Sequence, residues 1–256
     1  MSDTRDEVKR RFGASAENYV RSKDHAQGES LDRLIEVTAP RSEWRALDVA
    51  TGGGHTALAL SPLVREVVAT DLTAPMLAAA ERFIREKGVA NVRFQEADAG
   101  ALPFEDASFD LATCRIAAHH FPDIAAFVRE AARVVRPGGL VAVIDNVVPE
   151  DPEAAAAINA WEKARDPSHD RALPASEWRQ LFQRAGLAIE HDEAFRKARD
   201  FEAWIGRMPV DAATKERVRA MLTDSRGGMR EFLRPEGEDG ALRFYLEEIL
   251  VIGRRS

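Results

Sequence analysis

The sequence predicts an α/β fold built on a mostly parallel β-sheet with helices on both faces. Short β-rich runs alternate with helical stretches along most of the chain, which is typical of parallel strands joined by crossover helices. The first run, residues 45–50, leads directly into three consecutive glycines and then a helical pattern. An acidic residue, Asp71, ends the second run. A glycine turn after one strand and a carboxylate after the next are typical of nucleotide-type α/β sheets.

Seven strands are expected, at residues 45–50, 67–71, 92–96, 111–114, 140–144, 188–191 and 241–252. A helix begins at Ala74-Pro75, because the N–H that proline lacks would be unpaired in a first helical turn. Lys87-Gly88 provides its C-terminal end. A second helix is expected over residues 123–135 and ends at Pro137-Gly138.

Composition narrows the class of protein. The 256 residues are 45% hydrophobic and 31% charged, as in ordinary globular proteins. The net charge of −7 and the absence of a strong basic stripe disfavour a nucleic-acid partner. The single cysteine, Cys114, excludes an intramolecular disulfide and fits a reducing compartment. The charged N-terminus lacks a signal-peptide core, and no apolar run approaches the ~18 residues of a membrane span, so a cytoplasmic protein is expected.

The glycine run predicts a cofactor that contains adenosine. Glycine lets the backbone press against a ligand at the end of a sheet. Asp71 lies near the ~20-residue offset at which a carboxylate can hold a ribose in such folds. Gly52, Gly54 and Ala57 also satisfy the G-x-G-x-x-A form of the dinucleotide fingerprint, so the glycines alone do not select the cofactor.

The residues before the glycines do distinguish the candidates. Asp48 lies inside the first strand, where a pyrophosphate would be repelled by its charge. Asp48-Val-Ala-Thr51 resembles motif I of the class I S-adenosylmethionine-dependent methyltransferases, which carry an acidic residue just ahead of the glycine loop. The methionine end of S-adenosylmethionine offers an ammonium group that a carboxylate favours.

Later segments extend this resemblance in order to Ile144, and more weakly to the C-terminus. Asp98-Ala99 matches the family's adenine-binding position, and residues 102–110 resemble its link into the fourth strand. Arg136-Pro-Gly-Gly139 resembles the loop before the fifth strand. The resemblance is closest to the branch of the ubiquinone/menaquinone C-methyltransferases and small-molecule methyltransferases. It implies a Rossmann-like sheet of seven strands with S-adenosylmethionine as cofactor and S-adenosylhomocysteine as product.

The resemblance also implies a division of the chain. One domain, 1–256, would hold a cofactor-binding core at 41–150 and a substrate-side half at 151–256. Helical patterning outside the alternation adds an N-terminal helical cap at 1–40 and a helical insertion at about 199–235. We expect these added helices to cover the substrate pocket, since ligands bind above the strand ends in this fold. The alternative is peripheral helices with no part in the site.

The resemblance and the fold together assign the cofactor site. Gly52 and Gly54 would approach the cofactor, Asp71 would bind the ribose, and Asp98 would accept a hydrogen bond from the adenine. Leu72 and Met76 either flank the adenine or pack in the core. Tyr19 lies in a segment resembling the one that folds over the methionine part in this family. The complete expected set is Tyr19, Asp48, Thr51, Gly52, Gly54, Asp71, Leu72, Met76, Asp98, Ala99 and Arg115.

Three histidines are candidates for catalysis. His119 and His120 follow the fourth strand, at the edge where cofactor and substrate should meet, and histidine transfers protons near neutral pH. Their side chains must point in different directions, so at most one acts as a base. His120 is favoured because Phe121-Pro122 fixes the chain after it, although a packing role is also open. His169, in the loop Asp166-Pro-Ser-His169, either orients substrate or caps a turn. No metal site is expected, because no third ligand has a recognisable spacing.

These features predict an S-adenosylmethionine-dependent methyltransferase acting on a small organic acceptor. An apolar or aromatic acceptor is expected because aromatic residues fall in the half that builds the pocket, namely Trp161, Trp178, Phe195, Phe201 and Trp204. Methyl transfer needs few fixed catalytic residues, so a related module that binds cofactor or a partner without transfer is an alternative. A nicotinamide-dependent oxidoreductase is a weaker alternative, disfavoured by Asp48 and Asp98. The oligomeric state is not predicted.

Overall fold

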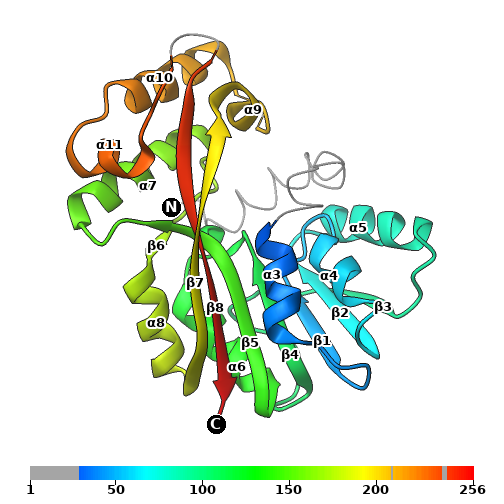
Figure 1. Ribbon diagram of the computed structural model, residues 1–256. Coiled ribbons are helices and arrows are strands. Elements are labelled where there is room, and N and C mark those ends of the chain that lie inside the picture. Colours follow the sequence, from blue (N-terminus) through cyan, green and yellow to red (C-terminus); the bar gives the residue numbers. More distant parts are fainter. Residues whose placement is uncertain (1–28, 209, 238–240) are drawn as a thin grey trace.

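The computed structural model describes residues 29–208, 210–237 and 241–256 (Figure 1). Its eight-stranded sheet has the order β3-β2-β1-β4-β5-β8-β7, with β6 paired to β5 off this path. The strands are β1 (Arg45–Val49), β2 (Glu66–Asp71), β3 (Val92–Glu96), β4 (Phe109–Arg115), β5 (Val135–Val148), β6 (Leu173–Pro174), β7 (Leu187–Asp200) and β8 (Arg243–Arg255). Strands β1 to β6 pair in parallel, and β8 is antiparallel to β5 and β7.

The predicted fold class is confirmed, with differences at strand ends. All seven expected strands are present. The two-residue β6 was not predicted, because it is too short to give an alternating pattern. Arg136-Pro-Gly-Gly139, expected as a loop, lies within the bounds of β5, where the pairing with β4 changes register.

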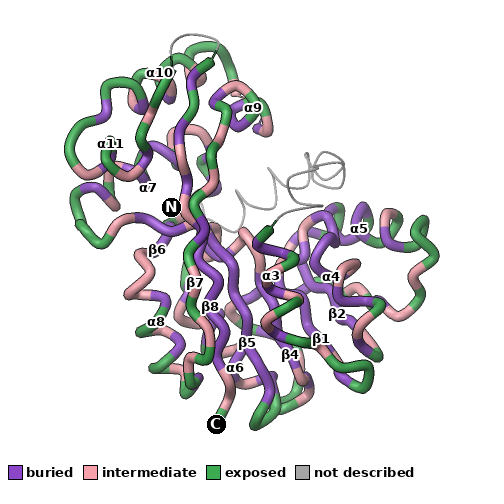
Figure 2. Tube along the Cα trace, in the orientation of Figure 1, coloured by how far each residue is buried: buried purple, intermediate pink, exposed green. Residues whose placement is uncertain are grey.

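Helices cover both faces of the sheet, because alternate strand residues point to opposite faces. On one face, Leu47 and Val49 of β1 pack with residues of α6 (Ile124–Val134) and α8 (Ala175–Arg184). On the other face, Ala46 packs with residues of three helices. These are α3 (Glu29–Thr38), α4 (His55–Leu60) and α5 (Ala74–Glu86). Figure 2 shows the resulting buried interior along the sheet.

A second, smaller lobe is built on the far half of the β7–β8 hairpin. β5 pairs with β8 only as far as Glu247, whereas β7 and β8 stay paired out to Asp200 and Arg243. This lobe contains α7 (Pro152–Arg165), α9 (Phe201–Ile205), α10 (Ala212–Thr223) and α11 (Gly227–Leu233) (Figure 1). It has its own hydrophobic core, which includes Trp161, Trp204 and Phe244.

The added helices lie in two different places. The expected insertion at about 199–235 forms α9 to α11, although β7 continues to Asp200 before it begins. Of the expected N-terminal cap, residues 1–28, Tyr19 among them, lie outside the described residues. The described part, α3, packs against the sheet face, with Leu34 in the core, and does not line the main cavity.

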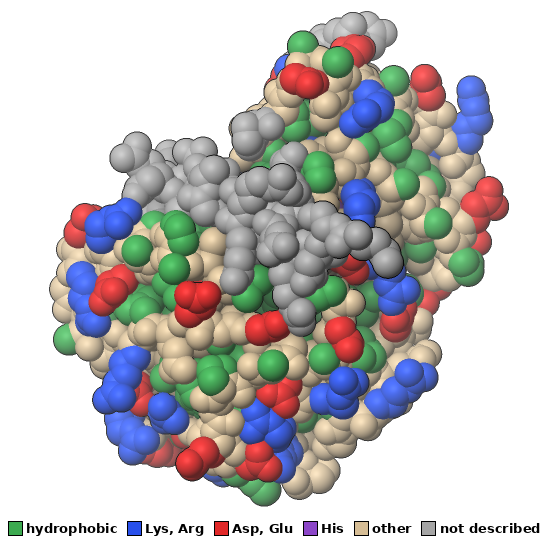
Figure 3. Space-filling view, turned by 180° about the vertical axis from the view of Figure 1, so that it is seen from behind, with side chains coloured by type: hydrophobic (Ala, Val, Ile, Leu, Met, Phe, Trp, Pro, Cys, Tyr) green, Lys and Arg blue, Asp and Glu red, His purple; other side chains and the backbone are tan. Residues whose placement is uncertain are grey.

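On the face seen in Figure 3, acidic and basic side chains are interspersed.

Candidate functional site

A cavity of about 750 Å³ lies at the carboxyl ends of the central strands. Its sheet-side wall comes from the loops after β1, β2, β3 and β4. Its opposite wall comes from the end of α7 and from the β7–β8 hairpin with α9. The cavity therefore lies between the sheet and the second lobe, in the position where open α/β sheets bind ligands.

The glycine loop after β1 combines an open position with a packed one. Gly52 lines the cavity with a φ of +54°, and a Cβ there would meet nothing within 4 Å. Gly54 has a φ of +81°, but a Cβ on it would lie 2.9 Å from Cδ1 of Ile84. Gly54 does not line the cavity; it allows the start of α4 to pack closely on α5. Gly52 thus leaves room for a ligand beside the backbone, whereas Gly54 serves packing.

Asp48 is a buried carboxylate in the cavity wall. Its Oδ2 accepts a hydrogen bond from the Thr51 hydroxyl at 2.6 Å, and its Oδ1 accepts one from the Thr113 hydroxyl at 2.9 Å. Burial raises the pKa of Asp48 to about 6, although the two hydroxyls and the nearby Arg115 oppose the shift. Such a carboxylate would gain from a cationic ligand group.

Asp71 is held at the end of β2 by hydrogen bonds to two loops. Its Oδ1 accepts from the backbone N–H of Thr73 at 3.0 Å and from the Thr73 hydroxyl at 2.7 Å. Its Oδ2 accepts from the N–H of Gly52 at 3.1 Å. Burial raises the pKa of Asp71, and these hydrogen bonds oppose the shift. Asp71 therefore fixes the glycine loop as well as presenting a carboxylate to the cavity.

The remaining expected cofactor residues lie around the same cavity. Asp98 accepts a hydrogen bond at Oδ1 from the N–H of Gly100 at 2.8 Å. Arg115 donates from Nε to the Thr56 hydroxyl at 3.1 Å, and burial lowers the pKa of its guanidinium. Of the predicted set, the cavity brings together Asp48, Thr51, Gly52, Asp71, Leu72, Met76, Asp98, Ala99 and Arg115.

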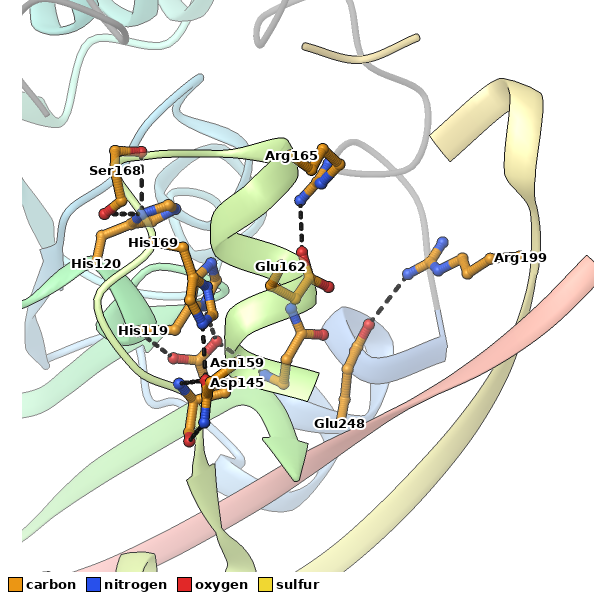
Figure 4. A network of polar contacts seen from close by, with 12 residues as sticks. His119, His120, Asp145, Asn159, Glu162, Arg165, Ser168, His169, Arg199 and Glu248 are labelled. Carbon is orange, nitrogen blue, oxygen red and sulfur yellow. Dashed lines mark hydrogen bonds and ion pairs between the residues drawn. The ribbon is translucent and has the colours of Figure 1, made fainter. Parts of the chain in front are cut away.

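His119 and His120 also line the cavity, in a short 3₁₀ turn over Ala118–His120 after β4 (Figure 4). His119 contacts buried Asp145 on β5 twice. Its backbone N–H donates to Oδ2 at 2.8 Å, and its Nδ1 lies 2.6 Å from Oδ1. Burial acts to lower the pKa of His119, but the charge and hydrogen bond of Asp145 outweigh it and raise the pKa above its usual value.

His120 is a weaker base than its neighbour. Its Nδ1 lies 3.0 Å from the carbonyl oxygen of Ser168, which can only accept, so Nδ1 carries the hydrogen. Burial and the adjacent His119 lower the pKa of His120 to about 4. The ring is therefore neutral near pH 7.

His169 does not line the cavity, and its ring centroid lies 5.4 Å from that of His119. Its Nε2 is 2.8 Å from Oδ1 of Asn159, and burial together with His119 and His120 lowers its pKa to about 2. The loop that contains it supports the other two rings, since Ser168 accepts from His120 and the N–H groups of Asp170 and Arg171 donate to the His119 carbonyl. This placement favours a supporting role for His169.

Several residues of the site were not predicted. Asp145 contacts His119 but does not line the cavity, and it continues β5 beyond the expected end at Ile144; a carboxylate inside an apolar strand was the available signal. The wall formed by the second lobe is charged and was not foreseen, because β7 was expected to end at His191. Its charged side chains include Glu162, Arg165, Lys197, Arg199, Arg207 and Glu248. Of the aromatic residues expected to face the pocket, Trp204 lines it. The others, Trp161, Trp178, Phe195 and Phe201, are buried in the cores instead.

The described residues contain neither a metal-binding cluster nor a membrane-spanning helix. Among them, no group of three or more His, Cys, Asp or Glu side chains is arranged to hold a metal ion. No helix within the same part of the chain is long and apolar enough to cross a membrane. Cys114 is buried in β4, and burial raises the pKa of its thiol well above the usual value.

Comparison with known proteins identifies the family to which the chain belongs. Residues 47–143 match the family model described as a methyltransferase domain. The chain belongs to the class I S-adenosylmethionine-dependent methyltransferases. The Bacillus subtilis protein YcgJ, described as an uncharacterized methyltransferase, is 39% identical over 244 residues, which are 94% of this chain and 96% of YcgJ. The crystal structure of YcgJ superposes with a TM-score of 0.85, 38% identity and coverage of 88% of this chain and 97% of YcgJ.

Two further proteins show a more limited likeness. The demethylmenaquinone methyltransferase of Thermus thermophilus is 40% identical over 115 residues, covering 44% of this chain and 52% of that enzyme. This enzyme belongs to the branch that the sequence resembles, and the likeness covers less than half of this chain. The geranyl diphosphate C-methyltransferase of Streptomyces coelicolor, solved with Mg²⁺, geranyl diphosphate and S-adenosylhomocysteine, shares the fold with a TM-score of 0.60 and 14% identity. That likeness covers 89% of this chain and 78% of the enzyme.

Proposed function

We propose that the protein transfers a methyl group from S-adenosylmethionine to a carbon, oxygen or nitrogen atom of a small organic acceptor, releasing S-adenosylhomocysteine. The observation that carries this proposal is one continuous cavity of about 750 Å³. It holds the Asp48–Gly52–Asp71 constellation at one end and His119 and His120 beside it. A donor site next to a proton-accepting group suits methyl transfer to an acceptor that must lose a proton.

The residues present fit the cofactor. The open space at Gly52 gives an adenosine moiety access to the backbone, and Asp71 would accept hydrogen bonds from the ribose hydroxyls. Asp98 would accept from the adenine amino group, and Leu72 and Met76 supply apolar contacts for the ring. Asp48 would pair with the ammonium group of the methionine part. The cofactor, when bound, supplies an activated methyl group on a sulfonium and leaves as a neutral thioether.

His119 is the side chain best suited to remove a proton from the acceptor. An ionised Asp145 can only accept hydrogen bonds, so Nδ1 of His119 carries the hydrogen and Nε2 of the neutral ring is the proton acceptor. The raised pKa of His119 makes it a stronger base near neutral pH than His120, whose pKa is about 4. We therefore assign the base to His119, positioned by Asp145, rather than to His120.

The acceptor is expected to be small and largely apolar or aromatic. Trp204, Met208 and Leu246 contribute apolar surface to the second-lobe wall of the cavity, opposite the sheet loops. The sheet loops and the second lobe together bound the cavity, which restricts the water that could compete with the acceptor.

Isothermal titration with S-adenosylmethionine and S-adenosylhomocysteine tests the donor assignment. Both should bind in the micromolar range, and NADH should not bind. Failure of both adenosyl ligands to bind would contradict the proposal.

Turnover separates an enzyme from the binding module considered as an alternative. Release of S-adenosylhomocysteine in the presence of small aromatic and aliphatic acceptors, measured by mass spectrometry, supports transfer. Binding without release from any acceptor class would favour the module.

A further inference from the structure

We propose that the second-lobe wall of the cavity binds an oxyanion, a carboxylate or phosphate, carried by the acceptor. This inference rests on the proposed function, because it names the class of molecule that the methyl group is transferred to. The wall contains a cation cluster, defined as Arg165, Lys197 and Arg199, and all three side chains line the cavity.

The cation cluster comes from two elements that face each other. Lys197 and Arg199 are alternate residues of β7 and so point to the same side of the strand. Arg165 is the last residue of α7. Figure 4 shows Arg199 extending from β7 toward α7, the helix that carries Glu162 and Arg165. The three cationic groups therefore border one region of the cavity.

Two buried carboxylates hold the cation cluster in place. Glu248, which is 2% exposed, lies 2.6 Å from Lys197 Nζ and 3.4 Å from Arg199 Nη2. Glu162 lies 3.0 Å from Arg165 Nη2. Among the described residues, this wall contains the four cationic side chains Arg165, Lys197, Arg199 and Arg207 and the three carboxylates Glu162, Asp166 and Glu248.

Arg165 contributes an unsatisfied hydrogen-bond donor to the cluster. Its Nε is buried and has no hydrogen-bond partner among the described residues. Its guanidinium carbon lies 4.2 Å from the ring centroid of Trp204, and this stacking fixes the plane of the donors. A buried N–H without an acceptor is unfavourable, so an oxyanion that accepts from it would bind with a clear advantage over a neutral group.

The same region supplies an apolar surface. Trp204, Met208 and Leu246 line the cavity next to the cation cluster. The wall therefore fits an amphiphilic acceptor, in which an anionic group contacts Arg165 and an apolar body extends toward His119. A neutral hydrocarbon alone would leave the Arg165 Nε donor without an acceptor.

Titration of simple probes tests this directly. Benzoate, phenyl phosphate and their neutral counterpart benzamide would be titrated calorimetrically into the full chain, with and without saturating S-adenosylhomocysteine. At least one anion should bind about 10-fold or more tightly than benzamide, and the preferred anion identifies the oxyanion. Equal binding of all three probes, or no anion binding at millimolar concentration, would overturn the proposal.

Two variants locate the binding. Arg165→Met keeps an unbranched side chain on Trp204 but removes the charge, and should abolish most of the preference for the anion. Arg41→Met is the matched control, since Arg41 also lies over a tryptophan, 5.8 Å from the Trp44 ring centroid, but does not line the cavity. An unchanged anion preference in Arg165→Met would refute the site. Arg199→Gln provides a second variant if circular dichroism shows that Arg165→Met is misfolded.

Affinity for S-adenosylhomocysteine separates this inference from the proposed function. It should be the same in Arg165→Met and the unaltered protein. If S-adenosylhomocysteine does not bind the unaltered protein, the proposed function fails, whereas the probe titrations without it still report on the anion site.

Discussion

The two ends of the cavity are built in different ways. The donor end is assembled from neighbouring segments, in which Asp48, Thr51, Gly52 and Asp71 are joined by hydrogen bonds across a strand–loop–helix unit. The acceptor end is assembled from distant segments, since His119 is paired with Asp145 and Lys197 with Glu248. Local backbone requirements fix the donor end, whereas tertiary pairing fixes the acceptor end. Substitutions at the two ends should therefore affect different measurements.

The largest effect is expected at the acceptor end. Asp145→Asn removes the charge that raises the pKa of His119, and loss of an oriented base reduces kcat by about 10²-fold or more. Because His119 must be neutral to accept a proton, activity should rise with pH through its pKa. The substitution lowers that pKa, so the rising limb moves to lower pH. Steady-state kinetics across pH measures both effects.

A control distinguishes this role from a structural one. His191→Gln changes a histidine of β7 that does not line the cavity, and its pH profile should match that of the unaltered protein. The affinity for S-adenosylhomocysteine should be unchanged in Asp145→Asn. A lower kcat with an unmoved pH profile would contradict the assignment of Asp145 as the residue that positions His119.

The second largest effect is expected at the donor end. Asp71→Ala removes a charge-assisted partner of the ribose hydroxyls and also frees the Gly52 N–H that Asp71 holds at 3.1 Å. A charge-assisted hydrogen bond contributes about 1.5–3 kcal/mol, so the Kd for S-adenosylmethionine should rise about 10- to 100-fold. Calorimetry measures this, with Asp106→Ala, an exposed carboxylate outside the cavity, as control. Unchanged affinity would show that Asp71 does not contact the cofactor.

The sequence predicted the donor end more completely than the acceptor end, and the reason is physical. The strand, the positive-φ glycine and the acidic strand end are short-range features, and β3 has the predicted bounds Val92–Glu96. Gly54 was assigned to the ligand because both glycines satisfy one motif; only the contact with Ile84 separates their roles.

At the acceptor end, the decisive features are not local. Residues 192–200 are mostly charged and show no regular alternation of apolar and polar side chains, so only their pairing with β8 reveals a strand. Lys197 and Arg199 therefore gave no signal of facing a cavity. Asp145 follows an apolar run whose end cannot be located without its neighbours β4 and β8.

The pKa of Asp48 predicts how cofactor binding at the donor end depends on pH. Its pKa of about 6 means that the carboxyl group becomes neutral as the pH falls through that value, and the cofactor ammonium then loses its partner. Affinity for S-adenosylmethionine should be constant above pH ~7 and fall about 10-fold per pH unit well below the pKa. Methylthioadenosine, which lacks the amino acid part, is the matched ligand and should show a flatter profile. Parallel profiles for the two ligands would mean that Asp48 does not contact the ammonium group.

The smallest effect separates the two glycines inside the donor end. Alanine at either position is strained by about 1 kcal/mol, because φ is positive at both. Gly54→Ala adds a Cβ only 2.9 Å from Ile84 and 3.2 Å from Ala80, so it should lower the free energy of unfolding further by about 1–3 kcal/mol. In Gly52→Ala the added Cβ meets open space, so the free energy of unfolding should fall only by the backbone strain of about 1 kcal/mol. The same Cβ would occupy space that the cofactor needs, so cofactor binding should weaken. Chemical denaturation and calorimetry together should therefore show opposite orders: Gly54→Ala less stable, Gly52→Ala weaker in cofactor binding. The same order in both measurements would mean that the two glycines share one role, as the sequence motif alone suggested.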